Sequence, residues 1–107
     1  MKKFDFNKMK GGWFVGNFEP TAYKTQDFEV AYMTHKKGEK WDKHLHKKAI
    51  EITLVIKGKI KLGEEIVSQG DIFIIEPEEI VDPTFLEDTE VAVVKTPSIP
   101  NDKYSLQ

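Results

Sequence analysis

The amino-acid sequence predicts an all-β domain of the sandwich or barrel type, and a jelly roll is the natural choice at this length. Short segments rich in β-branched and aromatic residues recur along the chain, and turns rich in Gly, Pro, Asp and Lys separate them. Helical periodicity is nearly absent, with room for one turn at most over Asn7 to Gly11. The 107 residues fit a single domain, so we expect one unit over residues 1–107.

The N-terminal half of the chain contains three of the expected strands. The aromatic segment Trp13 to Phe18 lies within an N-terminal strand region at 12–19. Phe28 to Thr34 alternates with the period of two that places every second side chain on one face. Gly38 then makes a turn, after which Lys40 to His46 is expected to be extended.

A hairpin is predicted in the middle of the chain. Ile50 to Lys57 is the clearest strand because it is rich in β-branched residues. Gly58 breaks this strand, and Lys59 to Leu62 returns as the second arm of the hairpin. A short strand over Glu65 to Val67 follows Gly63.

Two apolar segments in the C-terminal half predict strands that are covered on both sides. Ile72 to Ile75 and Val91 to Lys95 carry apolar side chains on both faces, and a shorter strand, Asp82 to Leu86, lies between them. A small isolated barrel has too little interior for so many apolar faces, so we expect one outer sheet face to form a homodimer interface. The barrel core spans about residues 28–96, and the tail that follows is polar.

The composition excludes several classes of function. The net charge is −2 and all sixteen basic residues are lysines, so bidentate recognition of phosphate or guanine by Arg is absent and no nucleic-acid partner is expected. The chain has no cysteine, which excludes disulfides, Cys–zinc sites and thiol nucleophiles. No segment has the length of a transmembrane helix, and Met1 to Lys10 lacks the apolar stretch of a signal peptide. We therefore expect a cytoplasmic protein with no membrane partner.

The residues that could carry chemistry gather between Gly38 and Gly58. His44 and His46 are two residues apart, so on a strand both imidazoles project from the same face. Glu51 lies at the head of the next strand and meets that face if the short link brings the two strands together. Two neutral imidazoles and one carboxylate can hold a divalent transition metal and leave positions open for substrate or water.

This stretch resembles the first motif of the cupin superfamily, in which two glycines and a glutamate stand at fixed offsets from a His-x-His pair. The residues that carry the resemblance are Gly38, His44, His46, Glu51 and Gly58. Gly70 to Pro77 is similar to the start of the second cupin motif, and the resemblance covers roughly residues 28–96. It implies a small single-domain cupin with a conical jelly-roll barrel, the double-stranded β-helix, which is usually dimeric.

The resemblance also implies a metal site. His44, His46 and Glu51 stand at the ligand positions of the first motif, and Asp82 stands where metal-binding cupins have a third histidine. With Asp82 bound through oxygen, the site would favour Mn or Fe(II), with Zn or Ni as alternatives. The other interpretation makes Asp82 a turn residue before Pro83 and leaves a degenerate, metal-free site that binds a ligand by hydrogen bonds.

Further residues are candidates for contact with a ligand. Thr53 shares a strand face with Glu51, Trp41 belongs either to the core or to a pocket wall, and Lys95 is either a strand-end charge or a pocket cation. The lysines around the histidines form either a solvated face or a positive rim that attracts an anionic molecule. His35 has no partner at motif spacing and is expected at the surface or at a strand end.

Two functions are compatible with these residues. The first is a cupin barrel that binds a polar small molecule, anionic ones included, at a divalent-metal centre, as a metalloenzyme of the isomerase, epimerase or oxygenase type. The alternative is a non-catalytic cupin that sequesters or senses a small molecule at a metal-free site, and the missing third histidine supports it. Both hypotheses stay open at this point, and with them the question of whether the protein is an enzyme.

Overall fold

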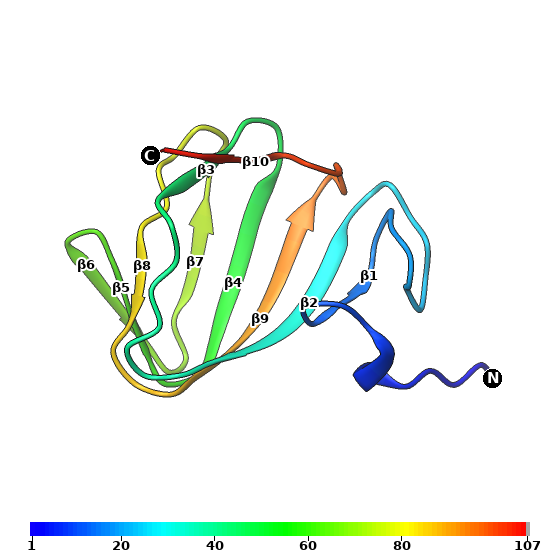
Figure 1. Ribbon diagram of the computed structural model, residues 1–107, viewed down its shortest axis with the longest axis horizontal. Helices are drawn as coiled ribbons and strands as arrows, with labels where there is room; N and C mark the ends of the chain where they lie inside the picture. Colours follow the sequence, from blue (N-terminus) through cyan, green and yellow to red (C-terminus); the bar gives the residue numbers. More distant parts are fainter. Residues whose placement is uncertain (107) are drawn as a thin grey trace.

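The computed structural model describes residues 1–106, which form strands and one short 3-10 turn (Figure 1). The elements are η1 (Phe6–Lys8), β1 (Trp13–Val15), β2 (Glu29–His35), β3 (His44–His46), β4 (Ile50–Lys57), β5 (Lys59–Leu62), β6 (Glu65–Ser68), β7 (Ile72–Ile75), β8 (Pro83–Phe85), β9 (Thr89–Thr96) and β10 (Lys103–Ser105). The prediction of an all-β domain is confirmed. Among the described residues, no helix has the length and apolar character that a membrane crossing requires.

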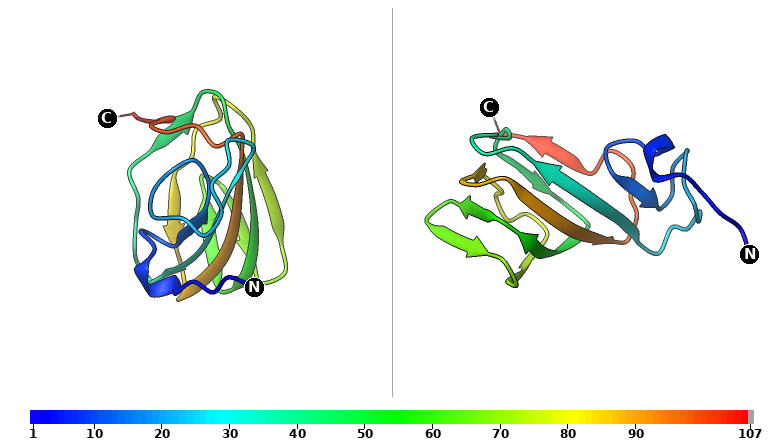
Figure 2. Two further views of the ribbon diagram at one scale, coloured as in Figure 1. Left: turned by 90° about the vertical axis from the view of Figure 1, so that its right-hand side faces the viewer. Right: turned by 90° about the horizontal axis from the view of Figure 1, so that it is seen from below.

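Three antiparallel sheets build the barrel. A five-stranded sheet has the order β1-β2-β9-β4-β7, a three-stranded sheet has the order β6-β5-β8, and β10 pairs with β3. The pair β10–β3 lies across one end of the larger sheet (Figures 1 and 2). The predicted hairpin of β4 with β5 is wrong, because β4 pairs with β7 and β9 whereas β5 pairs with β6 and β8. The turn between β4 and β5 instead carries the chain from one wall of the barrel to the other.

The core lies between the five-stranded and the three-stranded sheets. The period of two is visible along β4, where Thr53 and Val55 are buried while Leu54 and Ile56 are exposed. The buried apolar residues come from both sheets, and they are Ala31, Val55, Ile60, Phe85, Val91 and Val93. The inner face of β4 therefore combines the core with the polar residues of the cupin-like motif.

The turn from β4 to β5 depends on Gly58. Its φ angle is +98°, in the left-handed region that favours glycine. A Cβ at this position would press on the side chain of Thr89 and would lie 2.5 Å from the backbone oxygen of Asp88. The second glycine of the cupin-like motif is thus required by the close approach of the chain that leads into β9.

The strand bounds differ from the predicted ones at the two ends of the chain. Strand β1 stops at Val15, because the N–H of Gly16 already donates to the backbone oxygen of Tyr23 at 3.2 Å. The polar residues Lys103–Ser105 form β10, where no strand was predicted. All three of their side chains are exposed, so this strand has no apolar alternation by which its sequence could be recognised.

The outer face of the five-stranded sheet is apolar. Phe6 covers part of it by packing against Phe14 and Tyr32, with ring centroids 6.1 and 5.9 Å apart. The part over β4 and β7 is uncovered, and its exposed side chains are Leu54, Ile56, Ile72 and Ile74. Within the single chain, strand β7 is therefore covered on its inner face only, and not on both faces as its apolar sequence predicts.

Candidate functional site

Strand β3 places both histidines of the motif inside the barrel. Alternation along β3 turns His44 and His46 inward, with exposed fractions of 4% and 2%. Their rings meet edge to face with centroids 5.3 Å apart. The neighbouring strand β10 holds β3 in place, because Leu45 pairs with Tyr104 and His46 pairs with Lys103 in antiparallel register.

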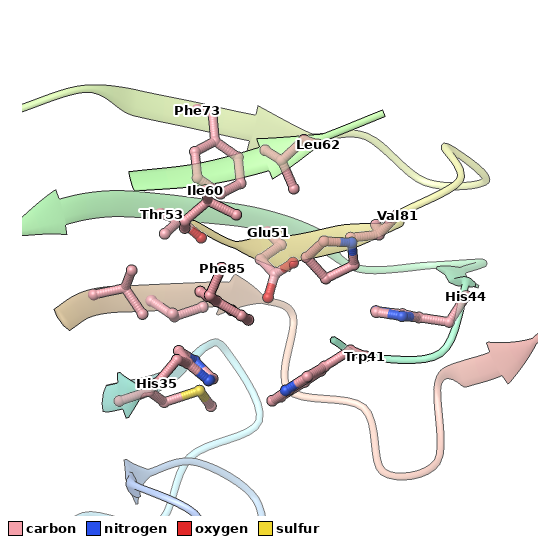
Figure 3. A pocket seen from close by; sticks show the side chains of 14 residues that line it. His35, Trp41, His44, Glu51, Thr53, Ile60, Leu62, Phe73, Val81 and Phe85 are labelled. Carbon is pink, nitrogen blue, oxygen red and sulfur yellow. The ribbon is translucent and has the colours of Figure 1, made fainter. Parts of the chain in front are cut away.

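Glu51 and His44 line the same cavity, which has a volume of about 70 Å³. Figure 3 shows the Glu51 side chain directed into this barrel cavity from β4, with the His44 ring facing the same space. Most of the remaining wall is apolar and includes Ile60, Phe73 and Phe85. An apolar cavity with a few convergent polar groups is the usual form of a small-molecule site.

Burial shifts the pKa values of the polar groups toward their uncharged forms. It raises the pKa of Glu51 above 4.5, although the nearby charges of Lys95 and Lys103 oppose the rise. Burial is also the main reason that the pKa of His44 is lowered from 6.5. Burial, with help from Lys95, lowers the pKa of His46 to about 4. Both histidines are therefore neutral at pH 7.

The two imidazoles differ in their hydrogen bonds. His44 Nδ1 lies 2.9 Å from the backbone oxygen of Asp42. Because a carbonyl oxygen only accepts, this ring carries its proton on Nδ1 and leaves Nε2 as an acceptor. Both ring nitrogens of His46 are buried and have no hydrogen-bond partner among residues 1–106. Buried polar atoms of this kind cost free energy, so a bound group that hydrogen-bonds His46 would be stabilised.

Asp82 lies away from the other three predicted ligands. Its neighbours Val81 and Pro83 are buried and line the barrel cavity, so alternation directs Asp82 to the opposite side of the chain. Its carboxylate lies 3.5 Å from Lys40 Nζ, in an ion pair whose lysine side chain is 63% exposed. This position corrects the expectation that Asp82 projects toward the histidines.

Two of the three predicted ligand contacts line the barrel cavity. Thr53 and Trp41 both do so, from β4 and from the segment before β3 (Figure 3). Lys95 does not line it but is the Cα partner of Glu51 in the sheet and pairs with Glu29 Oε1 at 3.8 Å. Its charge still acts on the site, since it lowers the pKa of both motif histidines.

His35 is a cavity residue that the sequence analysis did not assign to the site. His35 lies at the end of strand β2, in agreement with the predicted strand-end position, but it is only 8% exposed and does not lie at the surface. Its ring stacks on that of Phe85, with the ring centroids 4.0 Å apart. His35 Nδ1 lies 2.6 Å from Glu39 Oε2, which also accepts from Trp41 Nε1 at 2.7 Å. The period of two that runs inward from Ala31 is the signal that could have placed it.

The donor types of this site suit a transition metal, but their arrangement does not fit one as it stands. In the part of the chain that the structure describes, no three His, Asp or Glu side chains come close enough to hold an ion. Lys95 and Lys103 add positive charge beside both histidines, and the same charge disfavours a cation there. As they are arranged in this structure, these residues therefore do not hold a metal ion.

Comparison with known proteins finds similarity at the level of structure. No protein-family model matches the chain, and no curated protein is similar to it in sequence. A conserved protein with a double-stranded β-helix domain from Klebsiella pneumoniae matches with a TM-score of 0.67 and 21% identity, over 76% of this chain and 71% of that one. KdgF from Halomonas sp. matches with a TM-score of 0.61 and 24% identity, over 68% and 72%.

A third solved structure spans the whole chain. Streptomyces Pac13, described as a nucleoside dehydratase, matches with a TM-score of 0.73 and 13% identity, over 100% of this chain and 92% of that one. Other neighbours include a cupin-2 domain protein and oxalate decarboxylase. The chain therefore has the cupin fold, the double-stranded β-helix that the motif spacing implied. Identities this low establish the fold and leave the activity to be argued from the site.

Proposed function

We propose that this protein binds a polar small molecule in the barrel cavity and catalyses a proton transfer on it, the chemistry of isomerases and epimerases. One observation supports this proposal above the others. Glu51 and His44 face one cavity, and burial raises the pKa of Glu51 and lowers the pKa of His44. Titratable residues in a cleft whose pKa values are shifted by burial are candidates for the acid and the base of an active site.

The hydrogen bond of His44 and the burial of Glu51 support a different role for each residue. His44 is neutral and offers the lone pair of Nε2, so it can accept a proton from a C–H beside a carbonyl group. The protonated form of Glu51, which burial favours, can donate its proton to the carbonyl oxygen, and the product is an enol. When a proton returns to the other face of the same carbon and the enol O–H gives its proton back to Glu51, the product is an epimer. When that carbon bears a hydroxyl group, a proton can instead return to the former carbonyl carbon while the hydroxyl loses its proton to Glu51, and the product is an isomer. Most of the cavity wall around these two groups is apolar.

Hydrogen exchange into a bound compound tests this proposal. Native protein is incubated in D₂O with a panel of hydroxy-carbonyl compounds, namely aldoses, ketoses, their phosphates and hydroxy acids, and the loss of each C–H signal is followed by proton NMR. We expect one class of compound to lose a C–H signal, and His44→Gln and Glu51→Gln to slow that loss by about 100-fold or more. Asp82→Asn is the matched control, because this side chain pairs with Lys40 outside the barrel cavity, and the variant should leave the exchange rate unchanged.

Two results would count against proton transfer. If compounds bind but none of them exchanges hydrogen, the barrel is a binding module that sequesters or senses its ligand. If exchange occurs equally in wild type and in both cavity variants, other residues carry the chemistry. The proposal stands only if exchange is detected and depends on His44 and Glu51.

A divalent-metal centre is the second candidate, and the two unpartnered nitrogens of buried His46 favour it. His44, His46 and Glu51 would be its ligands after a change of side-chain orientation, and Mn, Fe, Zn or Ni would act as a Lewis acid on a substrate oxygen. Elemental analysis of protein purified without a metal-affinity tag distinguishes the two candidates. One equivalent of metal that is lost in His46→Ala would support the metal centre, and less than about 0.1 equivalent in wild type would exclude it as the resident state.

A further inference from the structure

A second cavity, of about 300 Å³, shares no lining residue with the barrel cavity, but its wall includes Lys95, the Cα partner of Glu51 in the sheet. Its walls come from the N-terminal strand, which contributes Trp13, and from the segment after β9, which contributes Pro100. The barrel cavity, at about 70 Å³, has room for only a few non-hydrogen atoms, since one water needs about 10–15 Å³ on such a measure. A metabolite with its reacting end in the barrel therefore has to extend beyond it, and the second cavity is large enough to receive the remainder.

Two lysines of the second cavity lie next to residues of the barrel cavity. Lys95 is the Cα partner of Glu51, which lines the barrel cavity, and also of Glu29, which lines the second cavity. Lys103 lines the second cavity, and its Nζ lies 4.6 Å from the ring centre of Trp41, which lines the barrel cavity. A molecule that spans the two cavities would pass both ammonium groups.

The acidic groups around the second cavity already have partners. Glu29 pairs with Lys95 at 3.8 Å and accepts a hydrogen bond from Ser98 Oγ at 2.7 Å. The carboxylate of Asp102 accepts three backbone N–H bonds from the link between β3 and β4. Glu19 pairs with a lysine of its own loop at 3.3 Å. None of these carboxylates is left to neutralise Lys103.

Lys103 has no ion-pair partner within residues 1–106. Although Lys103 is an exposed residue, partial burial of its side chain lowers its pKa, and the neighbouring charge of Lys95 lowers it further, while the carboxylates of Glu51 and Asp42 oppose the shift. The side chain of Lys95 is only 17% exposed and belongs to the wall of the site rather than to the solvated surface. An anion between the two groups would relieve their repulsion.

We propose that Lys95 and Lys103 bind the anionic group of the ligand, a carboxylate or a phosphate monoester, while the reacting end lies in the barrel cavity beside Glu51. The assignment of the reacting end rests on the function proposed above, whereas the anion subsite rests on the two lysines alone. Lysine binds such groups as a point charge, so the lack of arginine in this chain does not weaken the subsite. The substrate class is therefore a small acid or a phosphorylated compound rather than a neutral sugar.

The subsite is tested with inorganic phosphate and with acetate, titrated separately at low ionic strength. Backbone amide shifts of Ala49 and Asn101, which line the second cavity, report binding. We expect a dissociation constant of about 1–10 mM for the preferred anion, and we expect this constant to be about tenfold higher in Lys103→Gln. Lys57→Gln, which removes an exposed lysine at the far end of β4, is the matched control and should change the constant less than about twofold.

The outcomes separate the subsite from the proposed reaction. An unchanged dissociation constant in Lys103→Gln, or shifts spread evenly over the surface lysines, overturns the subsite. Phosphate or acetate binding that survives in His44→Gln and Glu51→Gln supports it, because those residues line the other cavity. If an anion binds at the lysines but no compound exchanges hydrogen, the subsite stands and the proton-transfer function falls.

Discussion

Asp102 connects the C-terminal segment to the link between the two strands that carry the site. Its carboxylate accepts backbone N–H bonds from Lys47 at 3.2 Å, from Lys48 at 3.1 Å and from Ala49 at 2.9 Å. Asp102 is only 6% exposed, so water reaches its carboxylate poorly. Removing it leaves three donors without their acceptor at the point where the chain passes from β3 to β4.

The magnitude follows from these three bonds. A hydrogen bond to a charged group contributes roughly 1.5–3 kcal/mol, less where water can replace the acceptor, as at the two part-buried donors. We therefore expect Asp102→Ala to lower the free energy of unfolding by about 3 kcal/mol. Urea unfolding followed by circular dichroism measures this loss. Asp71→Ala removes one exposed bond, from Ser68 N at 2.7 Å, and should cost less than about 1 kcal/mol. Equal losses in the two variants would refute the reasoning.

The pH dependence of the same group gives an independent check. Burial alone would raise the pKa of Asp102, but the three backbone donors outweigh it and hold the pKa below its usual 3.8. A carboxylate with a lowered folded pKa stabilises the fold above its unfolded pKa, and this contribution is lost as the pH falls through the folded pKa. The stability difference between wild type and Asp102→Asn should be full at pH 6 and should shrink below about pH 4. A difference that stays constant to pH 2 would contradict this explanation.

Two further predictions concern the outer face and the turn between β4 and β5. We propose that the uncharged outer face over β4 and β7 pairs with a second copy of the chain, because a symmetric contact there brings no like charges together. The double variant Ile72→Glu, Ile74→Glu should therefore convert a dimer to a monomer, as measured by size exclusion with light scattering. Ile80→Glu, an exposed residue outside that face, should not do so, and a monomeric wild type at micromolar concentration would end the proposal. Gly58→Ala should lower the free energy of unfolding by about 3 kcal/mol, against about 1 kcal/mol for Gly63→Ala, where a Cβ meets nothing within 4 Å. Similar losses at the two glycines would show that the approach of Thr89 is not what requires glycine.

The local strand pattern was enough to predict which site residues share a face. Glu51 and Thr53 both line the barrel cavity because the period of two along β4 is unbroken. The same period turns both motif histidines inward along β3. Such predictions depend only on neighbours in the sequence, so they hold wherever the strand itself is predicted correctly.

Contacts between distant segments were beyond the reach of this pattern. The spacing of the second motif predicted that Asp82 faces the site, but Val81 and Pro83 line the cavity instead. Because side chains in extended chain alternate between two faces, a difference of one residue is enough to turn Asp82 away from the site. Lys103 reaches the site because β10 pairs with β3, and no periodicity in the exposed tail indicates that pairing. Lys95 was thus a candidate from the sequence, whereas the position of Lys103 emerges only from the three-dimensional arrangement.

The position of β10 has a practical consequence for handling the protein. Lys103, Tyr104 and Ser105 lie directly alongside the strand of the two motif histidines, and they are among the last residues of the chain. A polyhistidine tag placed after this strand would add metal-binding imidazoles on the side of the chain that carries the motif histidines, and it would distort a measurement of metal content. The N-terminus lies at the opposite end of the molecule (Figure 1), so purification handles belong there.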